Sequence, residues 1–261
     1  TIDVYYYNQY YVNVISQIPI YAIINGENVT LSSGWYDQGC NITVENITYY
    51  PTQGERYVII SIYPLESLIV NSAIELDIVT LKQYYLAVSS PIPVYALVNG
   101  TNTTLTSGWY NADTTVVVEN ITYYPTQGER YIISQICPSS LTINAPSTIS
   151  VKTLLQFYIK VDSQVPVYAL INGTNTSFTS GWYNAGVKIT MENITFYPSE
   201  EERYVIVSVY PSESLIINSQ VSLTIVTIKQ YYIVINSIIP VYALVNGTNT
   251  TLTSGWYNSD T

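Results

Sequence analysis

The chain has 261 residues, a formal net charge of −10 at pH 7, only 10% charged residues, no histidine and 28 tyrosines. An acidic chain of this kind offers no basic surface for phosphates, so nucleic acid is not an expected partner. It contains no apolar run as long as a membrane span. Disorder is also excluded, because abundant Tyr, Ile, Val and Thr are typical of β-structure and not of unfolded chains.

A segment containing Ser-Gly-Trp-Tyr occurs four times, which indicates that the chain is a tandem array. Its tryptophans follow one another at intervals of 74, 73 and 74 residues, and the arginines of a Glu-Arg-Tyr segment at intervals of 74 and 73. The tryptophans are Trp35, Trp109, Trp182 and Trp256, and the arginines are Arg56, Arg130 and Arg203. A constant period of this size predicts repeated modules that gain stability from stacking on their neighbours.

The recurring Gln-Tyr-Tyr or Gln-Phe-Tyr segment sets the predicted domain boundaries. We predict an end strand of a preceding repeat at 1–8, β-sandwich repeats at 9–82, 83–155 and 156–229, and a partial fourth repeat at 230–261. The first assignment rests on the alignment of Asp3–Asn8 with Asp77–Lys82. The sequence is therefore interpreted as a piece of a longer, processed protein, with an end strand supplied by a neighbouring chain as the alternative.

The second repeat illustrates the predicted elements in chain order. Strands are predicted at 83–89, 94–98, 103–106, 115–119, 130–136, 141–143 and 147–154. Asn99-Gly100 predicts a tight hairpin turn, because both residues tolerate positive φ. The segment from Asn120 to Pro125 closes a strand, and Thr126-Gln127-Gly128 is predicted as a loop. The last strand leads directly to Gln156 without a Gly/Ser linker, which predicts a short and stiff joint.

The strand at 115–119 shows a half-buried alternation. The positions of Val116 and Val118 are apolar in each of the three full repeats, whereas the positions of Val117 and Glu119 are mostly polar. This period of two predicts one face in the core and one in water. Short strands with closely spaced turns predict an all-β fold of tandem Ig-like β-sandwich modules of about 73 residues. A β-grasp module is the alternative, but it needs a helix, and no 3.6-residue apolar pattern provides one.

The order of these segments resembles repeats of secreted and surface-exposed archaeal proteins, including the tails of thermopsin-type proteases. Those repeats are similar to the divergent internalin-B-like repeats of bacteria. The resemblance covers the whole chain and is carried best by residues 82–86 and 106–111. The family usually has a second Gly-Trp segment after the arginine, which Ile132–Cys137 lacks. The resemblance implies extracellular Ig-like scaffold modules and no catalytic residue.

Asn-x-Ser/Thr sequons are dense and recur in register. They begin at Asn28, Asn41, Asn46, Asn99, Asn102, Asn120, Asn172, Asn175, Asn193, Asn246 and Asn249. All lie in or beside predicted turns, where an acceptor must lie to be modified, so several are expected to carry N-glycans. Asn-Gly turns that need no glycan are the alternative for part of this set. Covalent N-glycans are expected, and no cofactor.

The tryptophans and tyrosines have two interpretations. Each tryptophan is predicted to anchor the core of its own repeat, with sugar-binding platforms as the alternative. Tyrosine pairs such as Tyr84-Tyr85 place one ring inward and one outward. The outward rings are numerous enough to predict contacts between modules or between chains.

The remaining candidates favour structure over chemistry. Cys40 and Cys137 are either two buried thiols or an inter-repeat or inter-chain disulfide. Arg56, Arg130 and Arg203 each follow a glutamate, which predicts an Arg–carboxylate pair that pins a strand. Without histidine, a Gly-x-Ser-x-Gly segment or a phosphate loop, neither an enzyme nor a catalytic, cofactor or metal site is expected.

These observations predict an extracellular, glycosylated structural repeat protein of a surface filament, surface layer or stalk. Its expected partners are copies of itself or other surface proteins, with no transmembrane span in this chain. One alternative is an adhesin or archaeal-virus tail fibre that grips surface glycans with exposed Tyr and Trp. The other is a non-catalytic tail of a secreted protease.

Overall fold

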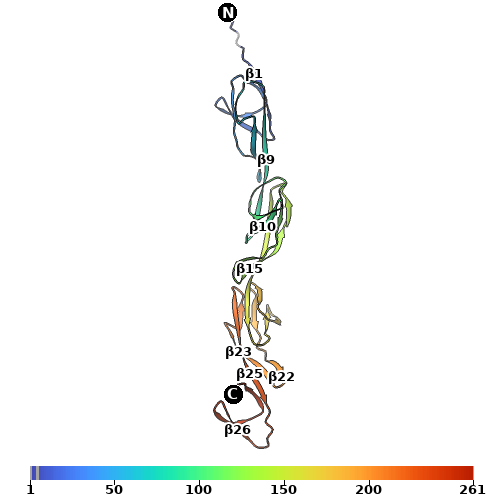
Figure 1. The fold of residues 1–261 in the computed structure, drawn as a ribbon, viewed down its shortest axis with the longest axis vertical. Coiled ribbons are helices and arrows are strands. Elements are labelled where there is room, and N and C mark those ends of the chain that lie inside the picture. Colours follow the sequence, from blue (N-terminus) through green and yellow to red (C-terminus); the bar gives the residue numbers. More distant parts are fainter. Residues whose placement is uncertain (1, 4–5, 261) are drawn as a thin grey trace. The chain divides into compact units, whose positions relative to one another are not determined.

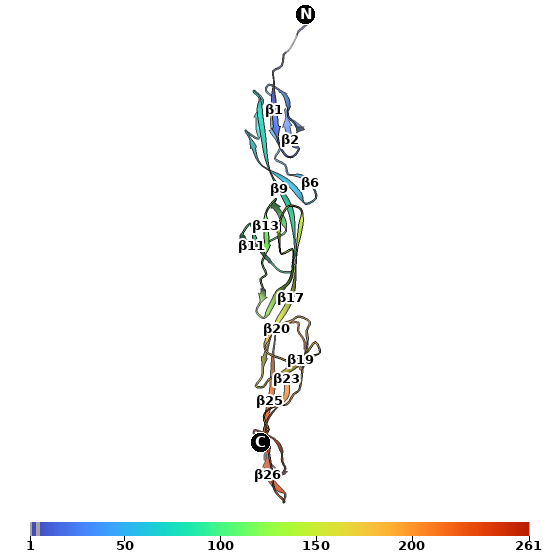
Figure 2. The same ribbon diagram turned by 90° about the vertical axis from the view of Figure 1, so that its right-hand side faces the viewer.

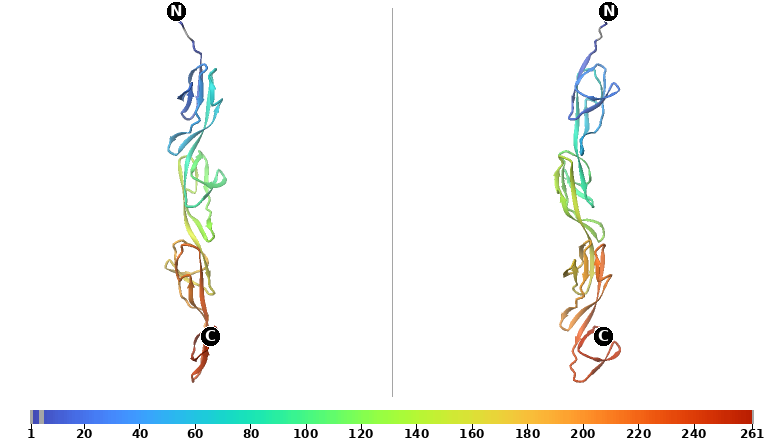
Figure 3. Two further views of the ribbon diagram at one scale, coloured as in Figure 1. Left: turned by 90° about the vertical axis from the view of Figure 1, so that its left-hand side faces the viewer. Right: turned by 180° about the vertical axis from the view of Figure 1, so that it is seen from behind.

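The protein is built from β-strands, as a computed structural model shows for residues 2–3 and 6–260, the part of the chain that the structure describes (Figure 1). None of those residues lies in an α-helix, and two further views show only strands and their connections (Figure 3). The all-β prediction is confirmed, and the β-grasp alternative is wrong because it requires a helix over the sheet. The described residues also include no helix long and apolar enough to cross a membrane.

The strands belong to two compact units, residues 1–120 with 135–152 and residues 121–134 with 153–261. The first unit contains β1 (Gln9–Ile15), β2 (Ile20–Ile24), β3 (Glu27–Leu31), β4 (Gly34–Asp37), β5 (Asn41–Val44), β6 (Tyr49–Thr52), β7 (Glu55–Tyr63), β8 (Ser67–Ile69), β9 (Ile74–Ser89), β10 (Val94–Val98), β11 (Thr101–Leu105), β12 (Gly108–Asn111), β13 (Thr115–Val118) and β16 (Ser140–Thr142). The second contains β14 (Tyr123–Thr126), β18 (Tyr168–Ile171), β19 (Thr174–Ser177), β20 (Gly181–Asn184), β21 (Lys188–Met191), β22 (Phe196–Ser199), β23 (Glu202–Tyr210), β24 (Ser214–Ile216), β25 (Val221–Ile233), β26 (Val241–Val245), β27 (Thr248–Leu252) and β28 (Gly255–Asn258). Strands β15 (Glu129–Cys137) and β17 (Ser147–Asp162) contribute residues to both.

The first repeat, which we call module 1, folds as two facing β-sheets. One sheet has the order β3-β2-β5-β8 and is antiparallel throughout. In the other, β1 lies between β4 and β9, and β7 pairs with the far side of β9. The pair of β1 with β9 is parallel and joins Val12–Ile15 to Ile74–Asp77. Two sheets that bury side chains between them make a β-sandwich.

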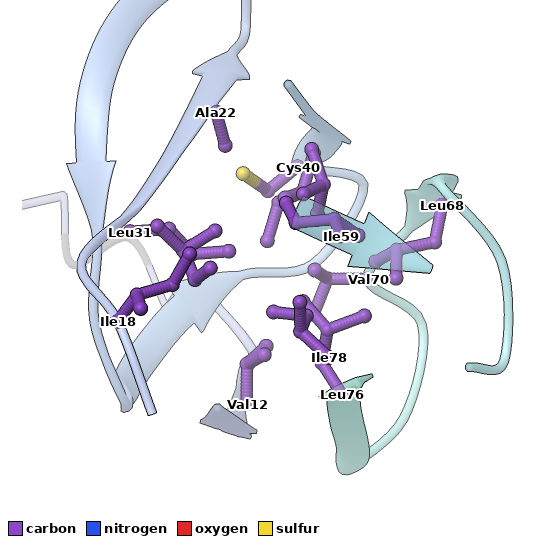
Figure 4. Close-up of a cluster of buried hydrophobic side chains, with 13 residues drawn as sticks. Val12, Ile18, Ala22, Leu31, Cys40, Ile59, Leu68, Val70, Leu76 and Ile78 are labelled. Carbon is purple, nitrogen blue, oxygen red and sulfur yellow. The ribbon is translucent and has the colours of Figure 1, made fainter. Parts of the chain in front are cut away.

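The core of module 1 lies between these sheets and consists of aliphatic side chains that alternate along the strands. Val12, Ile42 and Leu76 are fully buried. Figure 4 shows Val12 and Leu76 converging with Ile59 and the thiol of Cys40 on one interior. Burying one such aliphatic side chain contributes about 1.5–3 kcal/mol, so each module is held mainly by this packing.

Modules 2 and 3, the second and third repeats, have the same plan. Module 2 has a sheet of order β11-β10-β13-β16, and Leu86 and Val116 are fully buried in its core. Module 3 has a sheet of order β19-β18-β21-β24 over a core that includes Phe178 and Leu223. In the partial fourth repeat, β28 pairs with β25, and β26 pairs with β27. The chain is therefore an array of tandem β-sandwich modules.

Neighbouring modules share a strand instead of being joined by a loop. The predicted last strand of one repeat and the first strand of the next form one continuous strand of 16 residues, β9, and again β17. Figure 2 shows β9 leaving the strands of module 1 and continuing beside those of module 2. The predicted domain boundary at Gln83 therefore lies inside β9, because the backbone pairing of β9 continues on both sides of Gln83.

Two local differences from the sequence-based expectations concern the chain start and a hairpin, whereas one predicted turn is confirmed. Of the end strand predicted at 1–8, Thr1, Val4 and Tyr5 lie outside the described residues, and residues 2–3 and 6–8 are in no strand. The segment 123–126 is strand β14 despite its proline, so the loop predicted at 126–128 is a hairpin tip. The Asn99-Gly100 turn is as predicted, with φ of 48° and 80°.

Candidate functional site

The four tryptophans lie outside the module cores. In each Gly-Trp-Tyr strand the alternation directs Trp and Tyr to opposite faces, so only one ring can lie inside. The tyrosine takes the inner face: Tyr36 and Tyr183 pack against the cores of modules 1 and 3. The Tyr183 hydroxyl donates a hydrogen bond of 2.7 Å to the Thr179 carbonyl. The prediction that Trp35, Trp109, Trp182 and Trp256 are core anchors is therefore wrong.

Trp109 lies instead in a contact between modules 1 and 2, which we call the first joint. The hairpin of β6 and β7 extends beyond module 1, because β7 places Arg56 beside Gln83 of the shared strand β9. There the guanidinium carbon of Arg56 lies 4.6 Å from the centroid of the Trp109 ring. A guanidinium over an indole face is a cation–π contact, and tryptophan is the best aromatic partner for it.

Two tyrosines complete the aromatic part of the first joint. Tyr50 of the hairpin meets Trp109 edge-on at a centroid distance of 5.9 Å, and Tyr85 of β9 does so at 5.5 Å. Tyr85 is 39% exposed, whereas its neighbour Tyr84 is 9% exposed. This agrees with the prediction that one ring of the pair points inward and the other outward. Edge-to-face pairs stabilise beyond the area that they bury, so this joint has directional contacts as well as hydrophobic ones.

Hydrogen bonds fix the position of the arginine and of the hairpin tip. The Nε of Arg56 donates to Oε1 of Gln83 at 2.7 Å, and Nε2 of Gln83 donates to Oδ1 of Asn111 at 2.8 Å. The backbone N–H of Tyr85 donates to the Gly54 carbonyl at 2.8 Å. Gly54 has a φ of 80°, and a Cβ there would lie 2.9 Å from the ring of Pro146, so the tip requires glycine.

The second and third joints repeat this geometry in the other unit. Arg130 lies 4.5 Å from the ring centroid of Trp182, and Arg203 lies 4.5 Å from that of Trp256. The arginine Nε again donates to the glutamine that opens the next repeat, at 2.8 and 2.7 Å. The hairpin tyrosines, Tyr124 and Tyr197, meet these tryptophans at 6.0 and 5.9 Å.

Trp35 occupies the same place in module 1 but has no such cover among the described residues. Tyr11 meets it edge-on at 5.6 Å, as Tyr85 meets Trp109. Trp35 is nevertheless 67% exposed, whereas the other three tryptophans are half-buried. We call the surface formed by Gln9, Tyr11, Trp35 and Asp37 the Trp35 face.

The prediction that the arginine of each Glu-Arg-Tyr segment pairs with a carboxylate is wrong. Arg56 contacts Trp109 and Gln83, and the preceding Glu55 pairs with Lys82 at 2.8 Å. The Lys82 ammonium holds the pKa of the Glu55 carboxyl below its usual value by hydrogen bonding, and Glu55 in turn raises the pKa of Lys82. In module 3, Glu202 pairs with Lys229 at 3.0 Å. These glutamate–lysine pairs could not be predicted from the sequence, because each lysine lies in a later strand, 27 residues after its glutamate.

All eleven sequon asparagines are exposed, but they differ in what their side chains do. Nδ2 donates to a neighbouring glutamate from Asn28, Asn102 and Asn175, with partners Glu45, Glu119 and Glu192. The turn residues Asn99 and Asn172 accept backbone hydrogen bonds on Oδ1, which explains their recurrence without a glycan. The other six make no side-chain hydrogen bond with the described residues: Asn41, Asn46, Asn120, Asn193, Asn246 and Asn249. Glycosylation itself stays a prediction.

The two cysteines are free thiols in different surroundings. Cys40 is buried in the core of module 1, where burial raises the pKa of its thiol, and Cys137 is exposed at the end of β15. The bridge between Cys40 and Cys137 is therefore not formed, because one thiol faces the interior and the other faces solvent. The alternative of two buried thiols is wrong for Cys137. An inter-chain bond through Cys137 remains a prediction.

No protein-family model matches the chain, and no curated protein does. Among solved structures, the chain is similar to "Streptococcal High Identity Repeats in Tandem (SHIRT) domains 3-4 from cell surface protein", with 11% identity and a TM-score of 0.20. That alignment covers 56% of this chain and 96% of the other. A likeness this weak carries no argument about function.

Within residues 2–3 and 6–260, no cluster of three or more His, Cys, Asp or Glu side chains could hold a metal ion.

Proposed function

We propose that this chain is an extracellular structural protein, a glycosylated array of β-sandwich modules in a surface filament, surface layer or stalk. The observation that carries the proposal is the joint, which is built three times from the same arginine, glutamine, tyrosine and tryptophan. The three joints use the same residues at nearly the same distances. An array that transmits force needs the same strong connection at every step, and this is what the repeated joint supplies.

The strand order within a module also suits a mechanical role. The chain enters module 1 on β1 and leaves it on β9, and these neighbours run parallel. Module 2 has the same relation between β9 and β17, over Leu86–Ser89 and Ser147–Ser150. When the two ends of a module are pulled apart, the backbone hydrogen bonds of such a pair are loaded together in shear, not broken one at a time. Each module therefore resists extension, and the shared strand passes the load to the next.

Glycans form the second part of the proposal. We propose that six asparagines are modified first, because they are exposed and their amides make no hydrogen bond with the described residues: Asn41, Asn46, Asn120, Asn193, Asn246 and Asn249. Asn28, Asn102 and Asn175 follow, since their Nδ2 atoms already donate to glutamates. Glycopeptide mass spectrometry of the native protein measures this order directly. Higher occupancy at the turn residues Asn99 and Asn172 than at Asn46 would contradict it.

Single-molecule pulling on the ends of the full chain tests the mechanical role. We expect three high-force unfolding steps, each of which releases about 25 nm of extended chain for a module of this length. Thr148→Pro removes a backbone donor from the shared strand, and we expect it to weaken the step of module 2 alone. Thr148→Ala is the matched control and should leave all three steps unchanged. Unfolding of the normal chain without resolved high-force steps would overturn the mechanical proposal.

Localisation is tested separately. Immunogold labelling of unpermeabilised cells with an antibody against the chain should decorate fibres or a layer outside the membrane. Label that appears only after permeabilisation would overturn the extracellular assignment, whatever the pulling experiment shows.

A further inference from the structure

We propose that the N-glycans on Asn28, Asn102 and Asn175 lie along the outer face of the four-stranded sheet of each module, where a tyrosine ring and a glutamate carboxylate hold the first sugar. The inference rests on the proposed glycosylation and deepens it, because it assigns one set of sequons a position for the glycan on the protein. It starts from an asparagine, a glutamate and a tyrosine that the chain brings together in all three modules, which we call the Asn–Glu–Tyr cluster.

Module 3 shows the Asn–Glu–Tyr cluster at its shortest distance. Nδ2 of Asn175 donates to Oε2 of Glu192 at 2.7 Å. Asn175 lies on β19, opposite Leu170 of β18. From the other side of β18, the backbone N–H of Glu192 donates to the Tyr168 carbonyl at 3.0 Å. The asparagine side chain therefore crosses β18 diagonally, and its amide lies over the outer face of the sheet, between Leu170 and Tyr168.

Modules 1 and 2 repeat this arrangement. In module 2, Nδ2 of Asn102 donates to Oε2 of Glu119 at 3.4 Å. Asn102 lies opposite Leu97, and the N–H of Glu119 donates to the Tyr95 carbonyl. The corresponding residues of module 1 are Asn28, Glu45, Ile23 and Tyr21. In each complete module, the amide of this sequon is thus directed across the sheet and not away from it.

The groups beside the amide suit a sugar. Tyr168 and Tyr95 are 41% and 36% exposed, so part of each ring is open on this face. The C–H groups of a pyranose carry partial positive charge and pack against the negative face of an aromatic ring. Glu45, Glu119 and Glu192 are half-buried and make no ion pair with the described residues, so their oxygens keep acceptor capacity for sugar O–H or N–H groups.

Attachment of a sugar preserves the hydrogen bond that directs it. An N-glycosidic bond replaces one of the two hydrogens on Nδ2, and the other still donates to the glutamate. The first sugar then begins over the sheet and beside the tyrosine. It also covers apolar side chains of this face, such as Ile23 and Val117, which are 39% and 45% exposed.

A second protein molecule is the other class of partner for an exposed apolar sheet face. It does not explain why the side chain of a sequon asparagine lies across the face, because a bulky glycan there would exclude a protein partner. The Asn–Glu–Tyr cluster therefore favours the glycan of the chain itself.

The first test is ¹³C-edited NMR of the natively glycosylated chain. We expect the ring current of Tyr168 to shift the protons of the first sugar on Asn175 upfield, and Tyr168→Leu should remove this shift. The sugar on Asn193 is the control, because the Asn193 amide makes no hydrogen bond with the described residues, and its signals should be the same in both chains. Unshifted protons on a glycosylated Asn175, or a shift that survives Tyr168→Leu, would overturn the inference.

Amide hydrogen exchange gives a second measurement, which leaves the tyrosine in place. We expect the β18 amides to exchange about two- to tenfold more slowly in the glycosylated chain than in the same chain made in a bacterial host without N-glycosylation. Ser177→Ala removes the sequon of Asn175 and should abolish this difference, whereas Thr195→Ala removes that of Asn193 and should not. Equal exchange with and without the Asn175 glycan would overturn the inference.

Glycopeptide mass spectrometry of the same samples separates this inference from the glycosylation on which it rests. Occupied Asn46, Asn120 and Asn193 beside unmodified Asn28, Asn102 and Asn175 would overturn the inference alone. A native chain without a glycan at any sequon would overturn both.

Discussion

Trp35 and Trp109 occupy the same position in two modules, yet one is 67% exposed and the other is half-buried. Each has the same cross-strand tyrosine at nearly the same distance, 5.6 and 5.5 Å. The difference is the hairpin of the preceding module, which brings Arg56 and Tyr50 onto Trp109 only. A residue's burial is therefore decided here by the neighbouring module. The energy of the module core and the energy of the joint can be measured separately.

The largest expected effect comes from the core, which both modules need before either tryptophan matters. Leu76 is fully buried in module 1, and Leu76→Ala should lower the free energy of unfolding by about 2–5 kcal/mol. Denaturant titration of the full chain measures this. The matched control is Leu65→Ala, since Leu65 is 63% exposed and its loss should change the free energy of unfolding by less than about 0.5 kcal/mol. Comparable losses for both variants would contradict the assignment of the core.

The two tryptophans should differ next. Trp109→Ala removes the ring that Arg56, Tyr50 and Tyr85 contact, so we expect a loss of about 1–3 kcal/mol in denaturant titration. Trp35→Ala removes only the contact with Tyr11 and should cost less than about 1 kcal/mol. If the two substitutions lowered the free energy of unfolding equally, the tryptophan would stabilise its own module and not the contact between modules.

A double-mutant cycle sharpens the comparison to one contact. Arg56→Ala and Trp109→Ala should show a coupling free energy of about 0.5–2 kcal/mol, because the guanidinium lies over the ring. The control cycle combines Arg56→Ala with Trp35→Ala, and these changes should be additive. If Arg56→Ala and Trp109→Ala were additive, the cation–π contact would contribute nothing measurable to the stability of the joint.

The smallest expected effect is a pH dependence that distinguishes the first joint from the second. The Lys82 ammonium lowers the pKa of Glu55, so the folded state favours the carboxylate. The stabilisation from the ionised Glu55 is fully present above the ordinary pKa of a glutamate, and it is lost as the pH falls from there through the lowered folded value. In the second joint, Leu155 takes the place of the lysine.

Lys82→Leu copies that difference into the first joint. We expect the variant to lose less stability than the normal chain over this acidic window, as measured by thermal unfolding at a series of pH values. Leu155→Lys should have the opposite effect. Identical pH profiles for the normal chain and Lys82→Leu would show that the ion pair contributes nothing.

The sequence predicted the strands and the tandem plan because both depend on local chemistry. The alternation of Val116 and Val118 and the Asn99-Gly100 turn are each decided within a few residues. The face of Trp109 was not predictable in the same way. Alternation requires Trp109 and Tyr110 to point in opposite directions, but the sequence does not say which of the two points inward.

The contacts of the joint were missed for a different reason. Arg56 and Trp109 recur with the same period, and a shared period is compatible with contact inside one repeat or across two. The shared strand decides between these choices, since β9 carries the hairpin of module 1 onto the first strand of module 2. The absence of a linker before Gln83 and Gln156 was the available signal. It predicted a stiff joint but not the overlap of the hairpin.

The most direct test of the central claim, that the tryptophans serve joints and not cores, is the solvent accessibility of all four in the intact chain. Fluorine NMR of the 5-fluorotryptophan-labelled protein in H₂O and D₂O gives one solvent-isotope shift for each ring. The structure predicts a large shift for Trp35 and small shifts for Trp109, Trp182 and Trp256. Four equally small shifts would show that the tryptophans are core residues and would contradict the account.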